Sequence, residues 1–238
     1  MHSPIIDSHI HLYPESELDT LAWCSPDHLL RSQHSIDEYL SATSGQKNLR
    51  GFVFVETDRK SHLNSDRGWE QPLAEVDWIT RIAAGTARPN EGHSQGHAHL
   101  CLAIVPWAPV PLGAVALSRY VEQVKIRAGH VSNRITGFRY LVQDKPKSTM
   151  LQPGFIEGLC WLGEHGYSFD LGVDQRSGGL WQLDEAIEMI RKAHEGLPEG
   201  KKVTIVISTT LASALSISSI AESVDRSYVQ TGHAKPSW

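Results

Sequence analysis

Short apolar runs alternate with longer segments of helical periodicity along most of the chain. Six runs have the length and the β-branched or aromatic content of strands. They are Pro4–Ser8, Gly51–Glu56, Leu100–Val105, Ile135–Tyr140, Tyr167–Leu171 and Val203–Ile207. Two of these runs, Phe52–Val55 and Val203–Ile207, are nearly continuous in apolar or β-branched residues, which is typical of strands covered on both faces of a parallel sheet.

Apolar residues spaced three and four apart predict a helix in most of the intervals between these strands. The expected helices run from Ser35 to about Ala42, over Pro72–Ala84, Leu112–Ala128 and Gln152–His165, and over Leu180–His194. Ser35 and Glu38 have the spacing of a capping box. Repeated strand-then-helix order implies parallel strands with right-handed crossovers, so the sequence predicts an α/β fold of the (β/α)8 TIM-barrel type.

Two stretches break this alternation. Gly85–His99 is rich in turn-forming residues and holds three histidines, so we expect a surface loop there. Ser208–Trp238 is rich in Ser, Thr and Ala, with one weak helical pattern and no readable seventh strand. Since eight strands close such a barrel, the pattern predicts an incomplete barrel of about six strands in residues 1–207 and an atypical tail in residues 208–238.

Composition narrows the class of protein. The 238 residues are 40% hydrophobic and 21% charged, with a formal net charge of -5 and no cluster of Lys or Arg, which weighs against a nucleic-acid partner. No apolar run reaches membrane-spanning length, and the first residues do not resemble a signal peptide. The three cysteines lack CxxC spacing and are expected to be reduced thiols. We therefore expect a cytoplasmic protein that acts on a small molecule, with its oligomeric state open.

The residues best placed for chemistry close the first expected strand. His9 and His11 are two apart, so in an extended chain both side chains point the same way. They lie where catalytic groups collect in α/β barrels. Two imidazoles there can ligate a divalent metal or hydrogen-bond a substrate. The alternative is that both histidines only line a polar rim.

Three further polar residues fall at strand ends or inside strands. Glu56 follows a very apolar run, where a carboxylate must be paired or lie at the rim. Arg139 offers a fork suited to a carboxylate or an oxyanion, and Asp170 can orient an imidazole or accept a hydrogen bond from a hydroxyl. The alternatives are a structural ion pair between Glu56 and Arg139, and a loop cap for Asp170.

Two other signals point to weaker candidates. His93, His97 and His99 have spacings that permit metal binding, but their Gly- and Ser-rich context favours a surface loop. Ser94 lies in a GxSxG match by letter, but that motif needs a strand before it and a helix after it. A loop precedes Ser94 and a strand follows, so a nucleophilic serine is not expected.

Several segments together resemble a known family. Ile6–Tyr13, with the pattern xDxHxH, resembles the opening of the amidohydrolase superfamily, and in particular its amidohydrolase-related (amidohydrolase 2) branch with fungal sugar lactonases. Further similar segments are Phe52–Asp58, Ile104–Pro109, Gly137–Pro146, Phe169–Val173 and Gly179–Ile187. The likeness covers roughly Pro4 to Ile207, and it lies in the order and spacing of strand-end residues.

The resemblance implies a distorted (β/α)8 barrel that hydrolyses an ester, lactone or amide bond. It implies that His9 and His11 are the family's first-strand pair and bind a metal, if one is present, or the substrate carbonyl. It also implies that Glu56, Arg139 and Asp170 take the substrate-binding positions. The superfamily is typically metal-dependent, with zinc the expected ion, whereas some members of this branch work without a metal.

The chain departs from the family pattern near its end. The family usually continues after strand six with an Asn-His motif, and its eighth strand ends in an aspartate that acts as general base. Here Val203–Ile207 runs into Ser208-Thr209-Thr210-Leu211, so the histidine is missing, and the tail offers only Asp225 in irregular surroundings. Three interpretations stay open: a lactone hydrolase, a truncated or aberrant and inactive remnant, which the missing groups favour, and a metal-dependent decarboxylase.

Overall fold

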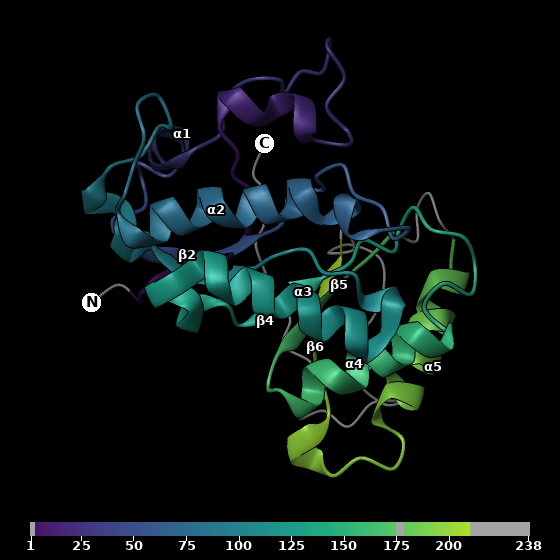
Figure 1. The fold of residues 1–238 in the computed structure, drawn as a ribbon. Helices are drawn as coiled ribbons and strands as arrows, with labels where there is room; N and C mark the ends of the chain where they lie inside the picture. Colours follow the sequence, from purple (N-terminus) through teal and green to yellow (C-terminus); the bar gives the residue numbers. More distant parts are fainter. Residues whose placement is uncertain (1–2, 175–178, 210–238) are drawn as a thin grey trace. The chain divides into compact units, whose positions relative to one another are not determined.

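The structure, a computed structural model, describes residues 3–174 and 179–209. The chain divides into two compact units, each built on a parallel sheet of three described strands (Figure 1). Unit 1 comprises Met1–Trp107 and Val121–Ile135, and unit 2 comprises Ala108–Tyr120 and Thr136–Trp238. Helix α3 (Gly113–Ala128) crosses the division, with its first residues in unit 2 and the rest in unit 1.

The sheet of unit 1 has the strand order β1-β2-β3. Its strands are β1 (Ile5–Ile10), β2 (Leu49–Val55) and β3 (Cys101–Val105), all parallel. The pairing of β1 with β2 is irregular, with register shifts after Ile5 and between Asp7 and Ile10. The second shift immediately precedes the end of β1, where His9 and His11 leave the regular ladder.

Two α-helices accompany this sheet, α1 (Ile36–Ala42) and α2 (Glu70–Ala84). Helix α1 begins with the expected capping box, in which the Glu38 carboxylate accepts a hydrogen bond from the Ser35 N–H at 2.8 Å. Helix α2 ends at Gly85, whose φ of 69° is left-handed and suits glycine. The remaining helical segments are the 3-10 turns η1 (Glu15–Thr20), η2 (Asp66–Trp69), η3 (Gln95–Leu100) and η5 (Gly129–Arg134).

The core of unit 1 lies between its sheet and α2. Phe52 and Phe54 on β2 are fully buried, as are Trp78, Ile79 and Ile82 on α2. The Phe54 and Trp78 rings meet edge to face, 6.4 Å between centroids. Burying each such side chain stabilises the fold by about 1.5–3 kcal/mol, so the apolar stripe of α2 is what holds the helix against the sheet.

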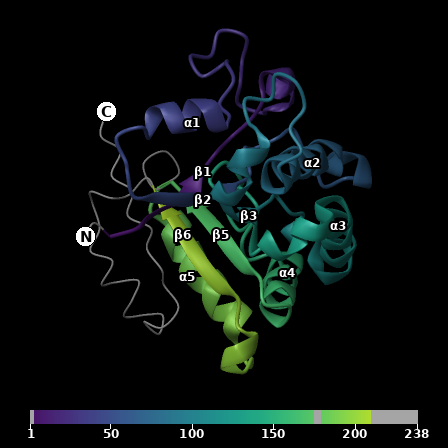
Figure 2. The ribbon, with the colours of Figure 1, turned by 90° about the vertical axis from the view of Figure 1, so that its left-hand side faces the viewer.

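The sheet of unit 2 has the order β4-β5-β6 and is also parallel. Its strands are β4 (Gly137–Arg139), β5 (Ser168–Val173) and β6 (Thr204–Thr209). Its helices are α4 (Pro153–Glu164) and α5 (Trp181–His194), and η4 (Val110–Leu112) and η6 (Glu199–Lys201) are short 3-10 turns. Figure 2 shows β5 and β6 side by side with α5 along them.

Aromatic residues form the core of unit 2. Phe155 on α4 meets Phe169 on β5 edge to face, with ring centroids 5.8 Å apart, and Tyr140 contacts the same Phe155 ring at 6.1 Å. Leu159 and Leu162 on α4 are fully buried beside them. The rings therefore join helix α4 to the strands in the same way that Trp78 joins α2 to β2 in unit 1.

All six expected strands and all five expected helices are present, with ends that differ by a few residues. For example, β4 is shorter than expected and β6 continues through Thr209. The expected weak helix of the tail, and Asp225, lie outside the described residues. The division between residues 1–207 and 208–238 therefore stays a prediction. Among the described residues no helix is both long and apolar enough to cross a membrane.

The expectation of a surface loop over Gly85–His99 is wrong for part of that segment. Glu91 and His93 are buried, and η3 begins at Gln95. Glu91 accepts hydrogen bonds from Arg81 Nε at 2.9 and 3.0 Å, and its backbone carbonyl accepts one from Ser35 Oγ at 2.6 Å. A turn-rich composition does not reveal such an ion pair, which draws the loop onto α2.

Candidate active site

The two histidines of the first strand lie together at its carboxyl end. His9 is half-buried near the end of β1, and His11 is exposed directly after it. Their ring centroids are 4.9 Å apart and the rings are nearly perpendicular, at 79°. The i, i+2 spacing in an extended chain therefore produces the pair that the sequence predicts.

The backbone of β2 orients the His11 ring. His11 Nδ1 lies 3.1 Å from the carbonyl oxygen of Val55 and 2.9 Å from that of Glu56. Carbonyl oxygens only accept hydrogen bonds, so Nδ1 must carry the hydrogen. In the neutral ring the lone pair is then on Nε2, and His11 presents an acceptor or metal-ligating nitrogen.

Glu56 follows β2 and is 1% exposed. Its backbone N–H donates to the carbonyl of Val105 at 3.0 Å, which continues the pairing of β2 with β3. Its carboxylate accepts a hydrogen bond from the N–H of Asp58 at 2.6 Å. Asp58 has a positive φ of 55°, so a tight turn folds back beneath the carboxylate and holds it at the strand end.

Arg139 and Asp170 meet in unit 2. They are register partners on the adjacent strands β4 and β5, and both are buried. Arg139 Nε lies 3.4 Å from Asp170 Oδ1. A Cβ at Gly172 would lie 2.8 Å from Arg139 Nη2, so the glycine leaves room for the guanidinium across β5.

Burial makes the Asp170 carboxyl a weaker acid than an exposed aspartate. It raises the pKa of the carboxyl to about 6, and the neighbouring Arg139 guanidinium only partly opposes this. Asp170 lies inside β5, so the interpretation of this residue as a loop cap is wrong. Its environment is that of a carboxyl that changes its protonation state close to neutral pH.

The structure thus brings together two sets of predicted residues. His9, His11 and the backbone of Glu56 are in contact in unit 1, and Arg139 and Asp170 are in contact in unit 2. The carboxylate partner seen for Arg139 within its unit is Asp170.

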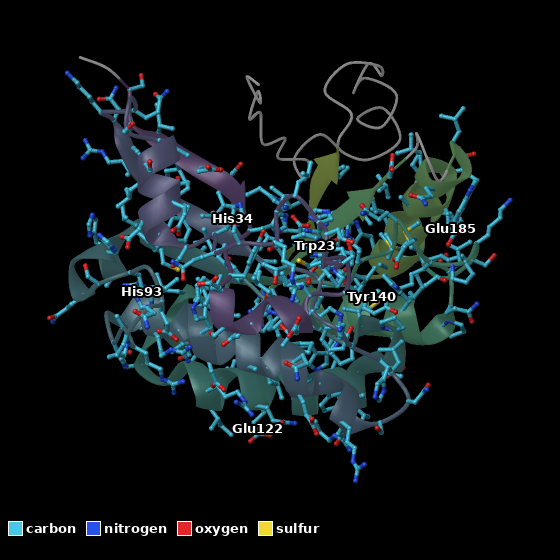
Figure 3. The ribbon with its side chains drawn as sticks, turned by 90° about the horizontal axis from the view of Figure 1, so that it is seen from above. Trp23, His34, His93, Glu122, Tyr140 and Glu185 are labelled. Atoms are coloured by element: carbon cyan, nitrogen blue, oxygen red, sulfur yellow. The ribbon has the colours of Figure 1, made fainter. Side chains whose placement is uncertain are left out.

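The histidines of residues 93–99 do not gather into a metal site. His93 Nε2 faces Glu91 Oε2 at 3.2 Å, whereas His97 Nδ1 accepts from the N–H of Ser94 and His99 Nδ1 faces the carbonyl of Gly96. Within residues 3–174 and 179–209, no three His, Cys, Asp or Glu side chains are arranged to hold an ion. Burial lowers the pKa of His93. In Figure 3 the labelled His93 lies well apart from the labelled Trp23.

Sequence reasoning missed a buried charged cluster beneath the end of β2. Arg59 is 1% exposed and Glu75 is fully buried, and their side chains pair at 3.3 Å. A signal was present, because Glu75 lies at helical spacing from Ile79 and Ile82, on the apolar face of α2. A charge on such a face requires a buried partner.

Sequence comparison relates the chain to a fungal lactonase. No family model matches the chain. It is 40% identical over 191 residues to the L-rhamnono-gamma-lactonase of Scheffersomyces stipitis, and the match covers 79% of the chain and 56% of that enzyme. The chain therefore spans little more than half the length of this relative.

Two solved structures share the fold. Amidohydrolase 2 from Bifidobacterium longum subsp. infantis is similar with a TM-score of 0.53 and 18% identity, over 88% of this chain and 64% of that one. An amidohydrolase from Burkholderia multivorans, crystallised with bound zinc, is similar with a TM-score of 0.57 and 18% identity. The match covers 86% of this chain and 57% of that one.

These neighbours and the parallel β/α units fit a TIM-barrel-like fold. The 40% sequence identity between the lactonase and this chain reflects common descent. The identity extends over 191 residues and not only over the first-strand motif. The chain is therefore similar in sequence to a fungal lactonase and in fold to amidohydrolases, as the resemblance of its strand-end residues predicts.

Proposed function

We propose that the protein hydrolyses a lactone, with a sugar-acid lactone as the favoured substrate. The observation that carries the proposal is the pair of histidines at the end of β1, with His11 held in one tautomer by the carbonyls of β2. The likeness to an L-rhamnono-gamma-lactonase supports the choice of substrate class.

The proposed reaction is attack of water on the lactone carbonyl. The neutral His11 ring accepts at Nε2, so its role is to receive a proton from the attacking water or to ligate a metal. The water oxygen bonds to the carbonyl carbon, the ring C–O bond breaks, and the leaving oxygen takes up a proton to give the hydroxy acid. His9, beside it, is assigned to binding at the carbonyl.

Arg139 and Asp170 are assigned to substrate recognition. The guanidinium is suited to a carboxylate or to hydroxyl oxygens. Ionised Asp170 accepts a hydrogen bond from a sugar hydroxyl, whereas its protonated form donates one. Because burial brings the Asp170 pKa to about 6, we expect substrate affinity to change across that pH. Glu56, held at the end of β2, is likewise assigned to substrate binding.

A divalent metal, zinc by analogy with the bound ion of the Burkholderia protein, fits part of this site. The Nδ1 hydrogen bonds of His11 direct Nε2 as they do in metal-ligating histidines. A catalytic zinc site usually takes three protein ligands, and the described part of the chain brings no such trio together. Such an ion would polarise the carbonyl or the water. A metal-dependent decarboxylase would need a firmly held ion, so tight metal binding in solution would favour it over the lactonase.

Two broader assignments accompany the proposal. The six described strands form part of a barrel of the (β/α)8 type, and the protein acts in the cytoplasm without a nucleic-acid or membrane partner. The three cysteines are free thiols, which agrees with a reducing compartment.

The test is hydrolysis of a panel of aldonic γ-lactones by this chain, followed by pH-stat titration. We expect His9→Ala and His11→Ala each to lower kcat/KM by at least about a hundredfold, the usual size of an acid–base or binding contribution. His165→Ala removes an exposed histidine of unit 2 and serves as the matched control with unchanged turnover.

Assays with added zinc and with a chelator separate the metal-dependent from the metal-independent reaction. Turnover that survives His9→Ala contradicts the assigned site. A folded chain without turnover on any lactone supports the inactive alternative instead.

A further inference from the structure

We propose that Glu75 is a positioning residue that holds His11 in its Nδ1–H form through one peptide group of the β2 end. The connection runs from the Glu75 carboxylate to the peptide between Glu56 and Thr57, and from that peptide to the His11 ring. The contacts stand independently, but the catalytic meaning of the His11 tautomer rests on the proposed function.

Glu75 reaches the end of β2 from inside α2. Its Oε1 accepts a hydrogen bond from the backbone N–H of Thr57 at 3.0 Å, and it is bonded to the Thr57 hydroxyl as well. The same oxygen accepts from Arg59 Nε at 3.3 Å. Three donors therefore converge on one oxygen of a carboxylate that is 1% exposed.

One peptide group joins this carboxylate to the histidine. The N–H of Thr57, bonded to Glu75, and the C=O of Glu56, bonded to His11 Nδ1 at 2.9 Å, are the two ends of the same planar amide. Fixing the N–H direction therefore fixes the C=O direction. A negative charge at the N–H end also polarises the amide and strengthens its carbonyl as an acceptor.

The arrangement is thus a carboxylate–peptide–imidazole relay. In metal sites a carboxylate or carbonyl that accepts from one ring nitrogen makes the other nitrogen more basic. Here the carbonyl performs that role and Glu75 enhances it from the far side of the amide. The consequence for His11 is a more basic Nε2 and a single tautomer.

Arg59 anchors the turn on its other side. Its Nη1 donates to Thr20 Oγ1 at 2.6 Å and lies 2.7 Å from Glu17 Oε2, both in η1. Trp23 Nε1 donates to the carbonyl of Thr57 at 2.8 Å. The turn after β2 is therefore held between α2 and the segment that follows β1, and it has little freedom to rotate the Glu56 carbonyl.

The surroundings of Glu75 act on its pKa in opposite directions. Burial raises the pKa of Glu75, and Arg59 and the two Thr57 donors oppose that rise. All three groups donate to Oε1, and each of these contacts favours the ionised form against the effect of burial.

The experiment uses the full chain with 15N-labelled histidine and long-range 1H–15N NMR, which reports tautomer and pKa for each ring. His11 is assigned by the signal lost in His11→Gln. Glu75→Gln keeps the shape and an acceptor for the Thr57 N–H but removes the charge. We expect its His11 to become a mixture of tautomers, and kcat to fall about tenfold with KM little changed.

The matched control is Glu185→Gln on α5. Glu185, labelled in Figure 3, is also buried and accepts two backbone N–H groups, from Ser148 at 2.7 Å and Met150 at 3.0 Å, but it belongs to unit 2. We expect it to lower the free energy of unfolding without altering the His11 tautomer. An unchanged His11 ring in Glu75→Gln, with a loss of stability like that of the control, would overturn the proposal.

A measurement on the wild type covers the case in which Glu75→Gln does not fold. The neutral His11 ring should show a single Nδ1–H form in the long-range 1H–15N spectrum, because both carbonyls beside Nδ1 only accept hydrogen bonds. A wild-type His11 ring with its hydrogen on Nε2, or with a mixture of tautomers, overturns the relay. Neither NMR measurement requires enzyme turnover. Both therefore still test the proposal if the lactonase assay shows no activity.

Discussion

Asp170 illustrates how one buried side chain acquires properties that its residue type does not have. It sits inside β5 with Arg139 as its register partner. Desolvation opposes the charged form more than the guanidinium favours it, and the pKa rises from 3.8 to about 6. The folded protein therefore holds this proton more tightly than the unfolded chain does.

The sign of the resulting pH dependence follows from linkage. A raised folded-state pKa contributes stability that is fully present below about pH 4 and is lost as the pH rises through about 6. We expect the free energy of unfolding of the wild type, relative to Asp170→Asn, to fall by roughly 2–3 kcal/mol between about pH 4 and pH 7. Urea denaturation at several pH values measures it.

The comparison with Asp170→Asn removes the effect of other groups, because the variant keeps every other carboxyl. Loss of the Arg139 partner adds an offset to the variant's stability but no slope in this range. Parallel curves for the two proteins would show that Asp170 does not bind its proton unusually tightly when the protein is folded.

At the scale of elements, α4 shows how small residues set the distance between segments. A Cβ at Gly158 would lie 2.5 Å from the carbonyl oxygen of Val110 in η4, and one at Gly154 would lie 2.4 Å from that of Pro111. The two glycines are four apart and share one helix face. They allow α4 to rest directly on the backbone of η4.

We expect Gly158→Ala to lower the free energy of unfolding by about 1–3 kcal/mol, because the methyl forces the helix away from η4. This direction is opposite to helix propensity, which favours alanine by up to about 1 kcal/mol. Thermal and urea denaturation would measure the change.

Gly45→Ala provides the comparison, since no atom lies within 4 Å of a Cβ at that position. Its effect should stay within about 0.5 kcal/mol. Equal free energies of unfolding for Gly158→Ala and the wild type would mean that η4 moves to accommodate the methyl group without a loss of stability.

At the scale of the whole molecule, the chain passes between its two units more than once. It leaves unit 1 after Trp107, re-enters it at Val121 and leaves it again after Ile135. The second crossing lies inside α3. A continuous helix shared in this way means that neither unit can unfold fully without breaking α3.

We therefore expect a proline at the crossing to weaken both units. Val121→Pro removes a helix hydrogen bond at a buried position and costs about 3 kcal/mol or more. Native-state hydrogen exchange should show faster exchange in both β2 and β5. Glu188→Pro on α5 lies in one unit only, and its effect should be largest in β5. Loss of protection confined to unit 1 in Val121→Pro would show that α3 does not couple them.

Much of the fold was predictable because it depends on local periodicity. The apolar run Phe52–Val55 becomes β2 and the stripe that includes Ile79 and Ile82 becomes the buried face of α2. The loop at Glu91 was not predicted well. Its burial depends on Arg81, ten residues earlier in the chain, and such a partner has no periodic signal.

The candidate site divides in the same way. The sequence by itself determined that His9 and His11 end one strand on the same side, because alternation in an extended chain requires it. It also determined which residues carry the acid and guanidinium groups. Only the tertiary structure decided that Arg139 pairs with Asp170, that Asp170 is a weak acid, and that His11 bears its hydrogen on Nδ1.

The physical reason is the range of each interaction. Strand and helix formation depend on neighbours within a few residues, and a pattern records them directly. A tautomer or a shifted pKa depends on desolvation and on donors from distant segments, such as Glu75 on α2 acting on the peptide after Glu56. Those contacts exist only once the chain has folded.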